Sequence, residues 1–192
     1  MARPVLRALA AVLTLLLTTA ACSSLEGTGD KGYISGNGQI TVVDPGERGE
    51  PVELEGTTLD GEPLSLADLR GSVVVVNVWW SACGPCRSEE PKLVAAHGQA
   101  EDAEFVGVNI RDSSVEPAQS FVRRFDVPYP SIFDPSGKAL LAFAGTLSPR
   151  TIPSTVLLDR QGRIAASVIG EIPSTLTLTD LVAQIADEPA DG

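Results

Sequence analysis

The sequence is poor in histidine and in cysteine. It has a single histidine, His97, and three cysteines in 192 residues. A zinc site formed around Cys83 and Cys86 would need two further ligands, and no second cysteine pair is present. Covalent haem attachment requires a histidine directly after the second cysteine of such a pair, and Arg87 stands there. We therefore expect no metal and no cofactor besides the cysteine pair itself.

Positive charge is scarce as well. The chain carries 14 Lys and Arg against 25 Asp and Glu, which gives a net charge of -11. An acidic protein repels phosphate backbones, so the composition argues against nucleic acid as a partner. Hydrophobic residues make up 43% of the chain, enough for one ordinary globular domain with its own core.

The chain has no hydrophobic run long enough for a transmembrane helix. The N-terminal run from Ala8 to Thr19 has about twelve residues, whereas a membrane span needs roughly 20. Arg3 and Arg7 precede this run and small residues follow it, which is the pattern of a cleaved signal peptide. We therefore interpret residues 1–21 as a signal peptide, and the protein as exported.

Cys22 directly follows this leader. The small residues before it resemble the end of a lipoprotein signal, after which the cysteine becomes the acylated first residue. Acylation of Cys22 would also leave an even pair, Cys83 and Cys86, in an exported protein. We predict a lipid anchor at Cys22 that holds the protein on the outer face of the cytoplasmic membrane. Without acylation the protein would be secreted.

The rest of the chain divides by composition. Residues 22–50 are rich in Gly, Ser and Asp and poor in large apolar residues, which predicts a flexible tether after the lipidated cysteine. Residues 51–187 have the patterning of a folded domain, and residues 188–192 are expected to be a disordered tail.

Strand and helix signals alternate along the domain. Val73–Trp79 is a β-branched run without alternation, as expected for a central strand buried on both faces. This order predicts an α/β sandwich with a mixed central sheet. The other predicted elements are a hairpin over 54–66, a helix over 87–96, a strand over 105–110, a helix over 113–125, a strand over 131–133, a short helix over 138–143, a hairpin over 155–169 and a terminal helix over 178–186.

Cys83 and Cys86 lie where the central strand passes into a helix. Unpaired N–H groups and the helix dipole at a helix N-terminus favour a thiolate, so Cys83 is the candidate nucleophile. Cys86 is within disulfide reach and can resolve a mixed disulfide by attacking Cys83. Pro85 lacks an N–H, which costs nothing at a helix start. A purely structural disulfide is the alternative, but so short a loop gains little from closure.

The stretch Val75–Pro91, which contains Cys83-Gly-Pro-Cys86 and Glu89-Glu-Pro91, resembles the TlpA/ResA branch of the thioredoxin superfamily, related to the AhpC/TSA proteins. Thr151–Val156 is similar to the same branch, and the resemblance covers about residues 51–186. It implies a thioredoxin-like three-layer sandwich with an N-terminal β-hairpin and an inserted segment. It also implies a thiol-disulfide oxidoreductase.

The resemblance assigns roles to further residues. Pro153 would be a cis-proline facing the cysteines, and the backbone of Ile152 would pair with an extended substrate segment. Asn77 stands where thioredoxins have a buried Asp, which shifts proton handling at the disulfide to Glu89. Glu90 is expected to be solvated. The predicted substrate-binding residues are therefore Ile152, Pro153, Gly84 and Pro85.

The expected function is thiol-disulfide exchange with exported proteins. Gly-Pro between the cysteines points to the reducing end of the potential scale, and the resemblance implies apocytochrome c as a substrate. A membrane electron-donor protein would re-reduce the pair, and we expect a monomer. Alternatives are an oxidant or isomerase that forms disulfides in secreted proteins, and a binding lipoprotein without chemistry, against which the intact pair argues. A peroxidase is disfavoured because Trp80 stands where peroxiredoxins have Thr.

Overall fold

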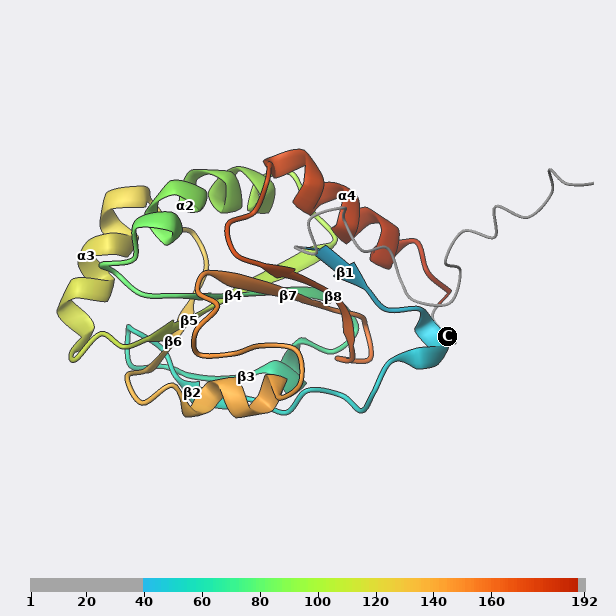
Figure 1. The fold of residues 1–192 in the computed structure, drawn as a ribbon, viewed down its shortest axis with the longest axis horizontal. Coiled ribbons are helices and arrows are strands. Elements are labelled where there is room, and N and C mark those ends of the chain that lie inside the picture. Colours follow the sequence, from blue (N-terminus) through green and yellow to red (C-terminus); the bar gives the residue numbers. More distant parts are fainter. Residues whose placement is uncertain (1–39, 190–192) are drawn as a thin grey trace, which may run out of the picture. The chain divides into compact units, whose positions relative to one another are not determined.

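The computed structural model describes residues 40–189, and Figure 1 shows their fold. The predicted signal peptide, Cys22 and most of the predicted tether lie outside the described residues. The elements, in chain order, are β1 (Ile40–Val42), η1 (Pro45–Glu47), β2 (Glu55–Thr57), β3 (Pro63–Ser65), η2 (Leu66–Leu69), β4 (Val73–Trp79), α2 (Gly84–His97), β5 (Ala103–Ile110), α3 (Val115–Phe125), β6 (Ser131–Asp134), η3 (Lys138–Phe143), β7 (Ser154–Leu158), β8 (Ile164–Ile169) and α4 (Thr175–Ala186).

Six strands form one mixed sheet in the order β1-β8-β7-β4-β5-β6. The neighbours β4, β5 and β6 run parallel, whereas β7 pairs antiparallel with both β4 and β8. Every residue of β4 is buried, as its unbroken run of apolar residues predicts. The hairpin of β2 and β3 forms a second, two-stranded sheet, so the predicted mixed sheet and N-terminal hairpin are confirmed.

Helices α2, α3 and α4 cover one face of the large sheet, and the hairpin and η3 lie on the other (Figure 1). Successive side chains of β4 point to opposite faces of the sheet, because side chains alternate along a strand. Val75 belongs to the same apolar cluster as Leu93 of α2 and Leu178 of α4, and Val76 to the cluster that contains Phe143 of η3. The predicted thioredoxin-like three-layer sandwich is confirmed.

The predicted domain boundary at residue 51 is wrong. Ile40–Val42 forms β1, which pairs with β8 at the edge of the large sheet. The average composition of residues 22–50 hides this β-branched triplet among Gly, Ser and Asp. The triplet nevertheless pairs with β8, which would otherwise be an open edge strand. The folded domain therefore includes residues 40–50.

The start of the predicted disordered tail needs the same correction. The side chain of Arg48 is 1% exposed, and its guanidinium donates to Asp159 at 3.0 Å and to both oxygens of Glu188 at 2.6 Å. Glu188, assigned to the tail, is thus held by a residue assigned to the tether. Within residues 40–189, no helix is long and apolar enough to cross a membrane.

Candidate active site

Strand β4 leads directly into the cysteine pair. Cys83 is the N-cap of α2, and the backbone N–H of Cys86 donates to its Sγ at 3.1 Å. The helix begins at Gly84, earlier than predicted, because Pro85 in its first turn needs no hydrogen-bond partner. Cys83 and Cys86 form a disulfide with 5.2 Å between their Cα atoms. Cys83 is 4% exposed and Cys86 is fully buried, so Cys83 is the more exposed residue of the pair.

The loop before Cys83 is held by a buried carboxylate. Asp112 accepts hydrogen bonds from the backbone N–H of Ser81 at 2.9 Å and from its Oγ at 2.6 Å. A third bond, at 2.8 Å, comes from the side chain of Asn109 in β5. Because β5 runs parallel to β4, with Asn109 opposite Trp79, both strands end at the cysteine loop. Sequence reasoning did not assign this role to Asp112; its place after the strand next to β4 is the signal that could have indicated it.

Glu89 is fully buried, one helical turn after Cys86. Its carboxyl accepts hydrogen bonds from Asn77 Nδ2 at 2.9 Å and from the backbone N–H of Ile172 at 2.8 Å. Burial raises the pKa of Glu89 to about 7, against the opposing effect of these two hydrogen bonds. A carboxyl with this pKa exchanges protons near neutral pH, as a proton-handling group must.

Glu90 is buried, which corrects the expectation that it is solvated. It is 2% exposed, and its Oε1 accepts a hydrogen bond of 2.6 Å from the hydroxyl of Tyr129. Burial raises the pKa of Glu90 to about 7, although the bond from Tyr129 lowers it. The signal missed here is Tyr129, distant in sequence, which supplies the partner that makes a buried carboxyl tolerable.

The Ile152–Pro153 peptide bond is cis, as the resemblance implied. Strand β7 runs antiparallel to β4 with Ser154 opposite Val78, so the residue before β7 lies beside the end of β4. Ile152 packs against the apolar cluster that contains both cysteines. The structure thus brings Ile152 and the cysteines together at one end of the sheet. Gly84 and Pro85, between the two cysteines, are exposed.

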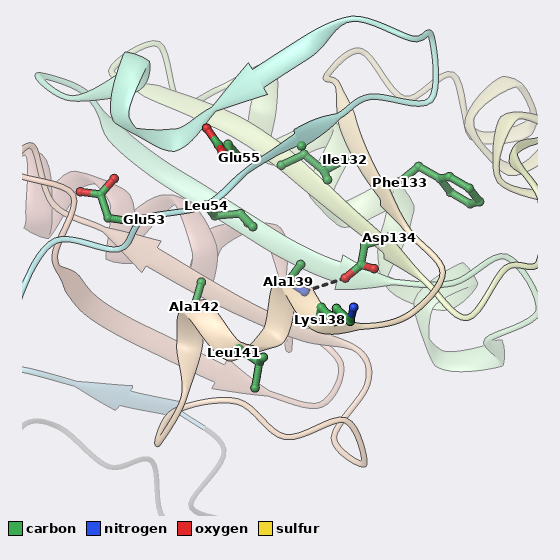
Figure 2. Close-up of a pocket in the computed structure, with 11 residues that line it drawn as sticks. Glu53, Leu54, Glu55, Ile132, Phe133, Asp134, Lys138, Ala139, Leu141 and Ala142 are labelled. Carbon is green, nitrogen blue, oxygen red and sulfur yellow. Dashed lines mark hydrogen bonds between the residues drawn. The ribbon is translucent and has the colours of Figure 1, made fainter.

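A separate groove lies on the side of the large sheet that carries the hairpin and η3. None of the predicted site residues lines it. It has a volume of about 490 Å³ and lies between β2, β6 and η3 (Figure 2). Asp134 on its wall is already engaged, since its Oδ2 accepts a hydrogen bond of 2.6 Å from the N–H of Ala139. No cluster of potential metal ligands occurs among the described residues.

Comparison with known proteins finds a matching family model and several relatives that are named as thiol-disulfide oxidoreductases or interchange proteins. A sequence model of the family described as Redoxin matches residues 44–185. The thiol-disulfide oxidoreductase ResA of Bacillus cereus is 27% identical over 117 residues, which cover 60% of this chain and 65% of ResA, less than two thirds of that relative's length. The thiol:disulfide interchange protein HelX of Rhodobacter capsulatus is 33% identical over 150 residues, 74% of this chain and 77% of HelX.

A solved structure extends the similarity to three dimensions. The secreted thiol-disulfide isomerase of Corynebacterium glutamicum superimposes with a TM-score of 0.74 at 30% identity. The superposition covers 82% of this chain and 98% of the isomerase.

Proposed function

The chain belongs to the Redoxin family, and from that premise we propose that it is an extracytoplasmic thiol-disulfide oxidoreductase. In this proposal it exchanges the Cys83–Cys86 pair with cysteines of exported proteins. The observation that carries the proposal is the disulfide itself, at the start of α2 with Cys83 as its more exposed residue. Secretion of a relative with 30% identity supports a location outside the cytoplasm.

The exchange proceeds in two steps from the reduced pair. The Cys83 thiolate attacks a substrate disulfide, forms a mixed disulfide and releases one substrate thiol. Cys86, as a thiolate, then attacks the sulfur of Cys83, restores the internal disulfide and releases the second substrate thiol. Two electrons pass to the substrate, whose two sulfurs each take up a proton.

Glu89 accepts the proton of Cys86 in the second step of this scheme. Residues three apart on a helix share a face, and Glu89 follows Cys86 by three positions in α2. Its pKa of about 7 leaves part of the population ionised and able to accept a proton at neutral pH. The side chain of Asn77 keeps the carboxyl in place from β4.

The substrate segment binds across Gly84 and Pro85 and pairs with the backbone of Ile152 beside Pro153. Two observations support this placement: the exposure of Gly84 and Pro85 between the cysteines, and the packing of Ile152 against the cluster of the two cysteines.

We further propose that the protein acts as a reductant of the cytochrome c maturation type, with apocytochrome c among its substrates and a membrane protein as its electron donor. The resemblance of Val75–Pro91 to the TlpA/ResA branch supports this direction. A lipid at Cys22 would keep the domain at the membrane where both partners meet.

The potential of the Cys83–Cys86 couple tests the direction. Equilibration with glutathione buffers, read out by alkylation of free thiols, should give a value near that of thioredoxin, about -270 mV. A value near -120 mV, like that of a strong oxidant, would overturn the reductant assignment and leave the exchange activity intact.

The second candidate is an oxidant or isomerase that forms disulfides in secreted proteins. The structural similarity to the isomerase of Corynebacterium glutamicum favours it. Oxidative refolding of a reduced, disulfide-containing substrate separates the two candidates, because only the oxidant or isomerase accelerates recovery of the native disulfides.

A further inference from the structure

Arg111 has a backbone conformation that residues other than glycine rarely adopt. It directly follows β5 at the active-site end of the sheet, and its φ of 66° lies in the left-handed region. Among residues 40–189, only Arg111 and Asp126 combine a positive φ with a side chain. Such strain persists only where surrounding contacts maintain it, and it concentrates at functional positions.

The contacts of Arg111 connect the two segments that flank the disulfide. Its guanidinium lies 5.8 Å from the ring centroid of Trp80, in the loop that leads to Cys83. It also donates a hydrogen bond to the carbonyl oxygen of Pro149, in the loop that leads to Pro153. The side chain nevertheless remains exposed, so its charge is available to a molecule approaching the cysteines.

Two further arginines belong to the same end of the fold. Arg87 in the first turns of α2 donates to the carbonyl oxygen of Ser81 at 3.1 Å and lies 5.5 Å from the ring centroid of Phe125. Arg150 is exposed and follows Pro149 directly. We call Arg87, Arg111 and Arg150 the arginine rim.

No salt bridge within residues 40–189 involves a side chain of the rim. The salt bridges of the described residues involve four other basic side chains, Arg48, Arg70, Lys92 and Arg163. Arg87 and Arg111 instead contact carbonyl oxygens and aromatic rings, which leave a guanidinium fully charged.

Two carboxylates near the start of α2 have partners outside the rim. Asp112 is 6% exposed and accepts hydrogen bonds from Ser81 and Asn109. Glu171 binds Lys92 at 2.7 Å. Arg111 and Arg150 thus present exposed positive charge at this end of the fold, in a protein whose net charge is -11.

We infer that the arginine rim is a docking surface for an acidic segment next to the cysteine of the substrate protein. Carboxylates of this acidic segment would form ion pairs with Arg111 while the substrate sulfur reaches Cys83. The inference rests on the proposed exchange activity and adds the charge of the substrate it prefers. Local positive charge at a site steers association even where the net charge has the opposite sign.

Three peptides test this inference. They share a central cysteine, joined by a disulfide to nitrothiobenzoate, and differ only in flanking residues: Glu, Gln or Lys. The reduced protein attacks this disulfide through Cys83 and releases coloured nitrothiobenzoate; Cys86 then frees the peptide thiol. The readout is the ratio of the second-order rate constants for the Glu and Lys peptides at low ionic strength.

For the wild-type protein we expect a ratio of about five to ten, which falls toward one as salt is added. The net charge alone would favour the Lys peptide, so its effect has the opposite sign. Arg111→Gln should bring the ratio closer to one, and combining it with Arg150→Gln should bring it closer still. Arg70→Gln makes the same change in net charge at a residue paired with Glu53, and should keep the wild-type ratio.

A wild-type ratio of one or below would overturn the inference, as would an unchanged ratio in the Arg111→Gln/Arg150→Gln protein. In both cases release from the Gln peptide shows that exchange itself is intact. Absence of release from all three peptides would instead overturn the proposed function, and the docking inference with it.

Discussion

The side-chain amide of Asn77 donates a hydrogen bond of 2.9 Å to the carboxyl of Glu89. The same amide donates to Oγ1 of Thr155 at 3.0 Å, so it links the central strand to α2 and to β7. Asn77 cannot itself take a proton, which leaves Glu89 as the titrating group of this contact. Burial raises the pKa of Glu89 to about 7 and makes the contact sensitive to pH in the neutral range.

Glu89→Gln should slow disulfide exchange near neutral pH by about a hundredfold, because it removes a proton acceptor but keeps the shape of the side chain. The wild-type rate should rise as pH increases through about 7, where Glu89 ionises. In the variant the rise should move toward the pKa of an ordinary thiol, about 8.5. Single-turnover reduction of a disulfide peptide from about pH 5 to about pH 9 measures both effects.

Glu90→Gln is the matched control for this experiment. Glu90 is the adjacent residue, is buried and has the same pKa of about 7, but its partner is Tyr129. The Glu90→Gln protein should retain the wild-type increase in exchange rate near pH 7. An unchanged profile in Glu89→Gln, or the same loss in both variants, would contradict a specific role for Glu89.

Cys86→Ala should trap substrates as mixed disulfides with Cys83, because it removes the thiol that resolves them. Non-reducing electrophoresis of cell extracts should show adducts that disappear on reduction, and mass spectrometry of these adducts would identify the exported partners. Cys83→Ser should form none, since Cys86 is fully buried and cannot replace the more exposed Cys83. Equal adduct formation by the two variants would contradict the assignment of Cys83 as nucleophile.

Local signals predicted the fold and the cysteine pair well. The apolar run of β4 and the proline in the first turn of α2 each specify their own conformation, and they place Cys83 at a helix start without reference to distant residues. The cis bond at Pro153 followed from resemblance, because sequence physics alone favours trans.

The remaining parts of the site depend on contacts between distant residues. Glu90 is buried, and Tyr129, 39 positions away, provides its hydrogen bond. Asp112 holds the cysteine loop because two parallel strands end side by side. No local pattern contains this information, since the partner becomes known only when the strands and helices have packed.

Glu90→Gln should make the free energy of unfolding less dependent on pH. The folded-state pKa of Glu90, about 7, exceeds its ordinary value of 4.5, so its stabilising contribution is complete below pH 4.5 and is lost as pH rises through 7. Between about pH 5 and about pH 8 this group should cost the wild-type protein roughly 2 kcal/mol, and the variant should avoid that cost. Urea unfolding of both proteins at both pH values gives the change in the free energy of unfolding with pH for each protein, and these two changes are then compared. Equal pH dependence in the two proteins would contradict the raised pKa.

Arg48→Met should destabilise the domain by about 3 kcal/mol, because it removes one partner of the buried Asp159 carboxylate and the partner of the partly buried Glu188. The side chain of Arg48 is 1% exposed and joins Asp159 to Glu188, so the residues before 51 and after 187 should stabilise the fold together. Arg70→Met removes an exposed ion pair with Glu53 and should cost less than about 1 kcal/mol. Urea midpoints at pH 7 compare the two variants. If Arg48→Met cost no more than Arg70→Met, the ion pairs of Arg48 would not contribute to stability, and β1 alone would join the segment before residue 51 to the domain.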